Sequence, residues 1–166
     1  NWANLLPNID CIVHCAGITH IPNHKNSNIN YIKEINAVNV ESTKKLAIQA
    51  AQAGVKRIVF LSSIKVNGES TVNSKFGKIS HNEKEVFTFS DKPSPKNLYA
   101  LSKLQAEQEL LEVSNKTNLE VVILRLPLVY GKGVKGNLHR LLNLVRLGIP
   151  LPFSIIKNMR SIIGID

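Results

Sequence analysis

The sequence predicts a doubly wound α/β fold, because short apolar segments alternate with longer segments of helical periodicity. The apolar segments span residues 10–15, 57–62 and 120–126, and their β-branched residues are typical of strands buried on both faces of a parallel sheet. The helical segments span residues 37–53 and 98–114. The order strand, helix, strand, helix, strand is that of a doubly wound parallel sheet.

Each predicted element is bounded by a local signal. The first strand, DCIVHC, ends at Ala16-Gly17, and the first helix is followed by Gly54, a residue suited to a helix C-terminus. The second helix presents one apolar side, formed by Leu101, Leu104, Leu110 and Leu111. A further helix is predicted from about residue 136 to 147, ended by Gly148 and Pro150.

Residues 67–97 separate the second strand from the second helix by an unusually long excursion. The segment is rich in Gly, Ser, Asn, Lys and Pro and has little periodicity. Long loops in compact domains are often lids or mobile functional segments. A surface insertion without a role fits the composition equally well, so both interpretations stay open.

Composition indicates one globular domain, since 43% of the 166 residues are apolar and 20% are charged. The longest apolar runs, around residues 119–128, are far shorter than the roughly 20 residues that a membrane span needs. Cys11 and Cys15 lack the spacing and second pair of a metal site. We interpret them as buried thiols of a protein in the reducing cytoplasm.

The formal charge of +9 favours an anionic partner. Nucleic acid is disfavoured, because the basic residues are scattered and no stacking aromatics accompany them. A phosphorylated small molecule as partner explains the excess of basic residues equally well, and so does the absence of an acidic part of a longer chain. A metal is not expected at His14, His20 and His24, since Pro22 argues against a helix there and no carboxylate cluster is nearby.

Tyr99 and Lys103 carry the chemical signal of the sequence. Their four-residue spacing places both side chains on one face of the second helix. A nearby ammonium lowers the pKa of a tyrosine, so that the pair can serve as a general base near neutral pH. Ser62 and Ser63 stand at the carboxyl end of the second strand, where open α/β sheets bind their ligands.

Five segments together resemble one known family, the extended short-chain dehydrogenase/reductases, and within it the nucleotide-sugar epimerases and dehydratases, which have Rossmann-like folds. In chain order they are VHCAG (residues 13–17), NVEST (39–43), FLSSIKVNG (60–68), Tyr99-x3-Lys103, and LRLPLVYG (124–131).

The resemblance implies a role for each matching residue. The catalytic residues it implies are Ser63, Tyr99 and Lys103, supported by Asn39. The residues it implies for NAD, with NADP left open, are Ala16, Gly17, Asn39, Tyr99, Lys103 and Pro127. Ser63, Asn137 and Arg160 are implied to bind the substrate, the last two through its diphosphate, for which the fork of donors on Arg is suited.

The sequence also departs from the family pattern. Ser42 stands in place of the usual Gly and Asn67 in place of the usual Tyr. The Gly-x2-Gly-x2-Gly loop and the residue that selects NAD or NADP are absent. We therefore interpret the chain as an internal fragment that lacks the first strands and the Gly-rich loop of its fold. Residues 1–133 would be the C-terminal part of a dinucleotide-binding domain and residues 134–166 the start of a substrate-binding region.

The function that the resemblance implies is NAD-dependent 4-epimerisation of a UDP-sugar, such as UDP-glucose and UDP-galactose or their N-acetyl forms, by a homodimer. A 4-keto reductase that uses NAD(P)H would employ the same Ser, Tyr and Lys, and these residues do not distinguish the two. A non-catalytic dinucleotide-binding protein is less favoured, because Tyr99 and Lys103 are both present.

Overall fold

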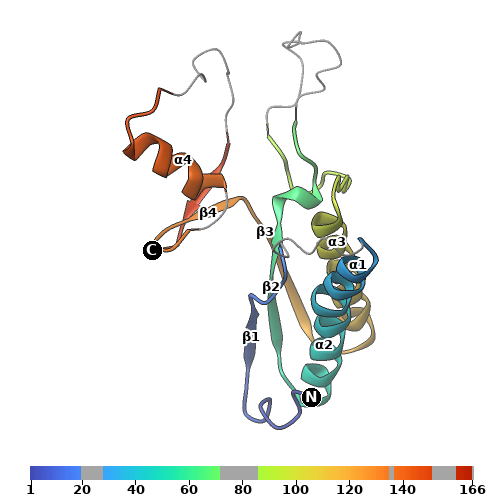
Figure 1. Cartoon of the computed structure of the whole chain (residues 1–166). Coiled ribbons are helices and arrows are strands. Elements are labelled where there is room, and N and C mark those ends of the chain that lie inside the picture. The colour runs from blue at the N-terminus through green and yellow to red at the C-terminus, as the bar shows by residue number, and fades with distance from the viewer. Residues whose placement is uncertain (20–27, 72–85, 135–136, 151–159, 166) are drawn as a thin grey trace. The chain divides into compact units, whose positions relative to one another are not determined.

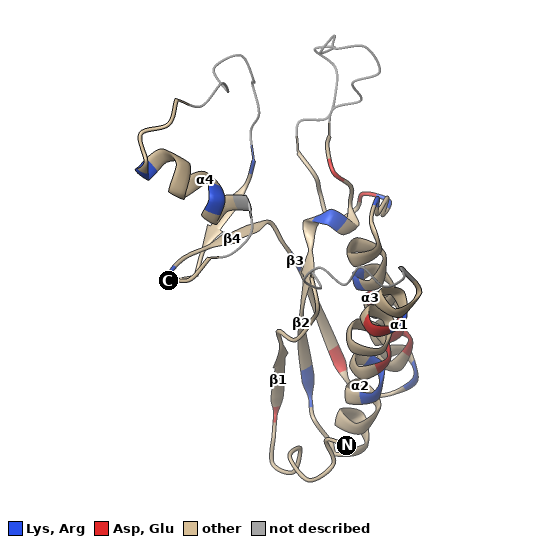
Figure 2. Cartoon of the chain, viewed as in Figure 1, with Lys and Arg blue, Asp and Glu red and all other residues tan. Residues whose placement is uncertain are grey.

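The structure, a computed structural model, describes residues 1–19, 28–71, 86–134, 137–150 and 160–165 (Figure 1). The chain forms two compact units, Asn1–Arg125 and Leu126–Asp166. The break follows Arg125, earlier in the chain than the functional boundary predicted after residue 133, which stays a prediction. In Figure 2, Lys and Arg lie scattered over helices and strand ends.

The first unit contains the three predicted strands, β1 (Cys11–His14), β2 (Arg57–Ser63) and β3 (Glu120–Leu126). They form one sheet in the order β1-β2-β3. β1 and β2 are parallel, with Cys11 opposite Arg57 and His14 opposite Phe60. β3 begins beside the start of β2, since the Glu120 amide donates to the Lys56 carbonyl at 2.9 Å. The predicted α/β class is confirmed.

The helices α1 (Asn28–Asn36), α2 (Ser42–Gln52) and α3 (Leu98–Lys116) lie on one side of this sheet (Figure 1). A π-helical turn, η1 (Ala37–Glu41), joins α1 to α2, so the helical segment starts nine residues before the predicted residue 37. The sequence of α1 gives little apolar signal because it places only Ile35 in the core. π-helical turns are rare and often found at functional sites.

The core lies between β2 and the helices. Ile58 and Phe60 alternate with more exposed residues along β2 and are fully buried. Ala47, Ala50 and Ala106 have no exposed surface, and these small side chains let α2 and α3 approach the sheet closely. Each fully buried large apolar side chain contributes about 1.5–3 kcal/mol to folding.

Cys11 and Cys15 are exposed, which corrects the prediction that both thiols are buried. Successive side chains of a strand point to opposite faces, and in β1 only Ile12 and His14 face the helices. Val13, on the other face, is 62% exposed. In the described residues of the first unit no helix covers that face.

Hydrogen bonds hold both ends of the long segment after β2 to the rest of the protein. A 3-10 turn, η2 (Ile64–Val66), follows β2 directly. The Asn67 amide donates to the Thr88 carbonyl at 3.2 Å, and the Ser94 amide donates to the Val66 carbonyl at 2.9 Å. Asn97 donates to Glu69 at 2.8 Å. The remainder of the excursion, residues 72–85, lies outside the described residues.

The second unit pairs β4 (Leu128–Tyr130) with β5 (Ile162–Gly164) in parallel and contains α4 (Asn137–Arg146). The predicted last helix is confirmed as α4, whereas β4 was not predicted as a separate strand. A Cβ at Gly131 would lie 2.2 Å from the Ile165 side chain, so only glycine fits there. Among the described residues of the chain, no helix is long and apolar enough to cross a membrane.

Candidate active site

Ser63 ends β2 and begins the turn that follows. Its backbone is extended, and its hydroxyl accepts a hydrogen bond from the Lys65 amide at 3.3 Å, which caps η2. β2 is the middle strand, so Ser63 stands at the carboxyl edge of the sheet, where open α/β sheets bind ligands. The side chain is half-buried and accessible to a ligand.

Tyr99 lies in the first turn of α3, close to the Ser63 side chain. The helix begins at this point because the Asn97 side chain accepts a hydrogen bond from the Ala100 amide at 2.9 Å. Burial raises the pKa of Tyr99 above its ordinary value of 10.0, and the hydrogen bond to the Ser63 side chain lowers it by less. The predicted convergence of Ser63 and Tyr99 is therefore present.

Lys103 is 3% exposed and turned toward β2. Its ammonium donates to the Leu61 carbonyl at 3.0 Å and lies 4.5 Å from the centroid of the Phe60 ring. Burial lowers the pKa of Lys103, while Cys15 and Glu107 raise it to a smaller extent. The net shift of the Tyr99 pKa is upward, opposite to the predicted one, because burial outweighs the effect of the Ser63 side chain.

The turn after β1 runs beside this lysine. A Cβ at Gly17 would lie 3.1 Å from the Lys103 Nζ and 3.4 Å from the Asn39 Oδ1, so a side chain would crowd both. Ala16 and Gly17 are exposed. Bare backbone next to a buried ammonium leaves room for a ligand to approach closely.

Asn39, in the π-helical turn, clamps the same loop to α3. Its Oδ1 accepts from the Ile18 amide at 2.7 Å, and its Nδ2 donates to the Ile18 carbonyl at 3.0 Å and to the Ser102 hydroxyl at 2.9 Å. Ser102 in turn donates to the Tyr99 carbonyl at 2.8 Å. Both amide hydrogens of Asn39 are therefore engaged, and its geometry suits a supporting role.

His14 and Thr43 form a hydrogen-bonded pair near Lys103 that was not predicted from the sequence. The His14 Nε2 lies 2.8 Å from the Thr43 hydroxyl, which donates its one hydrogen to the Asn39 carbonyl at 2.9 Å. The hydroxyl must accept from His14, so the imidazole carries its proton on Nε2. Burial, and next the charge of Lys103, lower the pKa of His14. His14 is thus a neutral core residue.

Sequence reasoning also missed the buried ion pair of Glu107 with Arg125. Glu107 is 2% exposed and accepts from the Arg125 Nε at 3.0 Å and Nη2 at 2.6 Å. The available signal was Arg125, a charged residue inside the apolar strand segment EVVILRL, because a charge in a buried strand requires a partner. The sequence did not identify that partner.

The remaining predicted site residues belong to the second unit. Pro127 lies between β3 and β4, Asn137 is the first residue of α4, and Arg160 is exposed just before β5. Their roles toward NAD and the substrate stay predictions. In the described residues no cluster of His, Cys, Asp or Glu could hold a metal.

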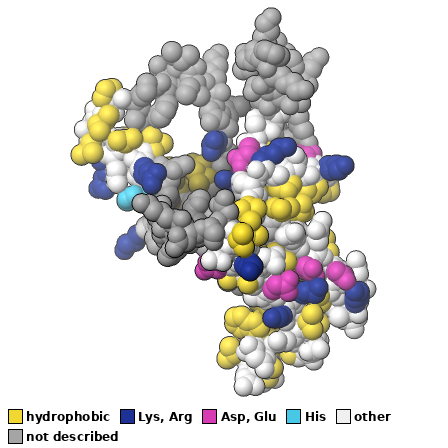
Figure 3. All heavy atoms as spheres, turned by 45° about the vertical axis from the view of Figure 1, so that its right-hand side comes forward, with side chains coloured by type: hydrophobic (Ala, Val, Ile, Leu, Met, Phe, Trp, Pro, Cys, Tyr) yellow, Lys and Arg dark blue, Asp and Glu magenta, His cyan; other side chains and the backbone are white. Residues whose placement is uncertain are grey.

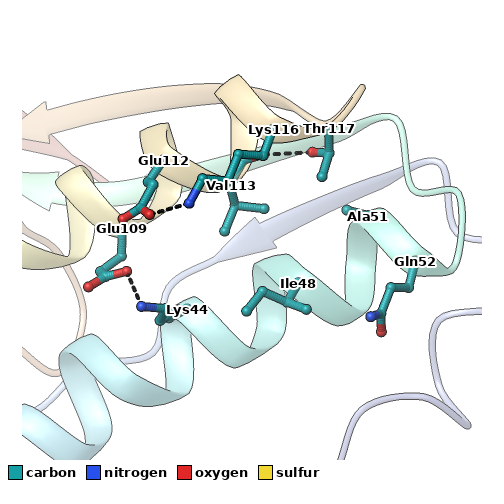
Figure 4. A pocket seen from close by; sticks show the side chains of 9 residues that line it. All are labelled: Lys44, Ile48, Ala51, Gln52, Glu109, Glu112, Val113, Lys116 and Thr117. Carbon is teal, nitrogen blue, oxygen red and sulfur yellow. Dashed lines mark hydrogen bonds and ion pairs between the residues drawn. The ribbon is translucent and has the colours of Figure 1, made fainter.

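A surface groove between α2 and α3 lies apart from these residues (Figure 4). Ile48, Ala51 and Val113 supply its apolar side chains. Ion pairs of Lys44 with Glu109, at 2.7 Å, and of Lys116 with Glu112 stand at its sides. Figure 3 likewise shows acidic and basic side chains next to one another on the surface. No candidate site residue lines the groove, and its charges are already paired.

Comparison with known proteins gives a consistent result. The model of the NAD dependent epimerase/dehydratase family matches residues 1–152. A UDP-glucose 4-epimerase of Vibrio cholerae is 40% identical over 163 residues, which cover 97% of this chain and 46% of that protein. An N-acetyl-alpha-D-glucosaminyl-diphospho-ditrans,octacis-undecaprenol 4-epimerase of Escherichia coli O157:H7 is 33% identical, over 67% of this chain and 30% of that protein.

Among solved structures, MoeE5 in complex with UDP-glucose and NAD superposes with a TM-score of 0.75 at 26% sequence identity. The match covers 99% of this chain and 51% of MoeE5. The chain therefore spans about half the length, or less, of the relatives it matches.

Proposed function

The chain belongs to the NAD-dependent epimerase/dehydratase family, and from this premise we propose that the protein containing it epimerises C4 of a UDP-sugar with NAD as cofactor. The observation that carries the proposal is the placement of the Ser63 side chain next to Tyr99 at the carboxyl edge of the sheet, with Lys103 one helical turn further along α3. The names of the Vibrio cholerae relative and of the MoeE5 complex support the UDP-sugar as substrate class.

The residues around Gly17 fit the nicotinamide side of NAD. Gly17 offers bare backbone where a side chain would crowd Lys103 and Asn39. Lys103 and Tyr99 bring an ammonium and a hydroxyl, groups that suit the hydroxyls of a ribose. Ala16 and Pro127 complete the proposed set, and Asn39 fixes the turn through Ile18. When bound, NAD supplies the hydride chemistry, taking a hydride from the sugar and returning it.

The proton chemistry belongs to Tyr99 and Ser63. Tyr99 takes the proton of the sugar 4-hydroxyl while C4 is oxidised, and Ser63 hydrogen-bonds the same oxygen. Because burial raises the pKa of Tyr99, the phenol needs a nearby positive charge before it can act as a base. Lys103 is the cation that α3 offers. The 4-keto sugar stays bound, rotates within the site, and is reduced at C4 on its other face.

The substrate diphosphate is assigned to Arg160 and Asn137. A guanidinium binds two phosphate oxygens at once, and an amide adds a further hydrogen bond. The homodimer and the cytoplasmic location stay predictions.

The deciding experiment is incubation of the whole protein with UDP-galactose, without added reduced cofactor, followed by product identification. We expect conversion to UDP-glucose, because an epimerase recycles its own reduced cofactor. Turnover only after a 4-keto sugar and NADPH are supplied would identify a reductase instead. No turnover of either substrate, with NAD still bound, would favour a binding protein.

A further inference from the structure

A buried polar network joins every segment that places Ser63. The Ser62 hydroxyl donates to Glu107, which also accepts both hydrogen bonds from Arg125. The third nitrogen of the Arg125 guanidinium, Nη1, donates to the Asn67 side-chain oxygen at 3.1 Å. Asn67 then donates to the Thr88 carbonyl at 3.2 Å. The network thus connects the end of β2, the turn η2, α3, β3 and the returning excursion.

The network brackets Ser63 on both sides in sequence. Ser62 directly precedes it and is 5% exposed, whereas Asn67 ends the turn that follows it and is also 5% exposed. Both residues are tied to the same ion pair, so neither end of the turn can shift without breaking a buried hydrogen bond. A buried polar group left without a partner is costly, which makes this arrangement stiff.

The same ion pair fixes α3 relative to β2. Tyr99, Lys103 and Glu107 are spaced by four residues and therefore lie on one face of α3, one turn apart. Each contacts β2 or its end, at Ser63, Leu61 and Ser62 respectively. Of the three, Glu107 alone forms an ion pair among the described residues, with the partly buried Arg125 of β3, and this pair restricts the rotation of the helix against the sheet.

We propose that Glu107 and Arg125 are positioning residues of the active site, which hold the Ser63 hydroxyl and the Tyr99 hydroxyl in reach of the same substrate oxygen. The inference rests on the proposed function, since it assigns these residues to the proton-transfer step. They act through Ser62, Asn67 and α3 and do not touch the substrate themselves.

The chain provides a matched control for this pair. Arg57, at the start of β2, and Glu120, at the start of β3, form a second ion pair, in which the Arg57 Nε donates to Glu120 at 2.8 Å. This pair is exposed, with side chains 53% and 61% accessible. It joins β2 to β3, whereas Glu107 and Arg125 join α3 to β3, and it lies at the end of β2 opposite to Ser63.

The test compares two double variants of the whole protein, Glu107→Leu with Arg125→Met and, as the control, Arg57→Met with Glu120→Leu. Replacing a buried ion pair by apolar residues of similar volume is often neutral for stability. We expect an unchanged KM in both. The thermal midpoint should fall in the first variant, because the buried Ser62 hydroxyl and the Asn67 side chain lose their partners, and should stay unchanged in the control. In the first variant only, kcat should fall on the order of 10- to 100-fold, as for misplaced reacting groups.

Fluorotyrosine labelling supplies a readout that does not depend on turnover. The fluorine resonance of Tyr99 is assigned by its loss in Tyr99→Phe. It should shift in the Glu107→Leu, Arg125→Met protein and stay in place in the control. The resonances of Tyr31 and Tyr130 should stay in place in both variants. If the parent does not turn over UDP-galactose, the proposed function fails, and the fluorine shift alone still tests the positioning role.

If the first double variant does not fold, Arg125→Lys decides by the same two readouts. It keeps the charge opposite Glu107 but cannot reach Glu107 and Asn67 together. Unchanged kcat and an unmoved Tyr99 resonance in the folded variant would overturn the positioning role, as would equal losses in the control.

Discussion

Removing the hydroxyl oxygen of Tyr99 tests the proposed chemistry directly. We expect Tyr99→Phe to lower kcat by roughly 10²- to 10⁴-fold, the usual contribution of a general base. Binding of the UDP-sugar should persist, because only the proton-transfer oxygen is deleted. Steady-state kinetics with calorimetric titration of the substrate make the measurement. Undiminished turnover would contradict the role of Tyr99.

Gly17 tests the fit of NAD. In Gly17→Ala the new methyl group would meet the Lys103 Nζ at 3.1 Å. This is the far end of a flexible side chain, so the fold should lose less than about 1 kcal/mol, within the range of mild substitutions. We expect the affinity for NAD to fall markedly in calorimetric titrations of the whole protein. Gly54→Ala is the control for affinity: its Cβ has open space but its φ of +80° strains alanine, so this variant should lose stability without losing affinity for NAD.

His14 gives the protein a pH dependence. Burial and Lys103 lower its pKa below the ordinary value of 6.5, so the unfolded chain binds this proton more readily than the folded one. The free energy of unfolding should therefore decrease as pH falls below about 6.5 and level off below the folded-state pKa. Denaturation of wild type and His14→Gln at pH 7.5 and 5.5 measures the difference. A parallel decrease in both proteins would exclude His14 as the cause.

Local spacing predicted the residues that share one helix face or one strand end. Tyr99 and Lys103 follow from α3, and Ser63 follows from the end of β2. His14, Thr43, Glu107 and Arg125 could not be assigned, because their partners lie on other elements and only tertiary packing brings them together. For the same reason the burial of Tyr99, and with it the direction of its pKa shift, was not predictable.

At the scale of elements, the start of α3 determines where Tyr99 lies. Asn97 accepts a hydrogen bond from the Ala100 amide and marks the first turn, which contains Tyr99. We expect Asn97→Ala to lower the free energy of unfolding by about 1 kcal/mol, the usual value of an N-cap. Chemical denaturation measures it, with the exposed Lys96→Ala as the control. An equal loss in both variants would show that the cap contributes nothing specific.

The elements were predicted to different depths. The strands and α3 followed from apolar runs and helical spacing, whereas α1 was missed because most of its side chains face outward. The π-helical turn, which contains Asn39 and its hydrogen bond to Ile18, had no signal in the sequence either. β4 is three residues long and exposed, too short for a pattern.

At the scale of the whole molecule, β1 leaves one edge of the sheet open. It pairs only with β2 among the described strands, and its residue Val13 is 62% exposed. Open edges with apolar side chains favour association. We expect chain 1–166, prepared alone, to self-associate with rising concentration in light scattering, and Val13→Lys to reduce this. The exposed Val86→Lys, away from the sheet edge, is the control and should change nothing.

The hydrogen bonds that hold both ends of the segment 67–97 affect how this protein can vary in evolution. The bonds from Asn67 to Thr88, from Ser94 to Val66 and from Asn97 to Glu69 hold both stems independently of the chain between residues 71 and 86. Doubling the length of a loop costs only about 0.6 kcal/mol of closure entropy. Insertions and deletions between these stems can therefore accumulate while Ser63 and Tyr99 keep their places, so a new specificity could be gained there without rebuilding the chemistry.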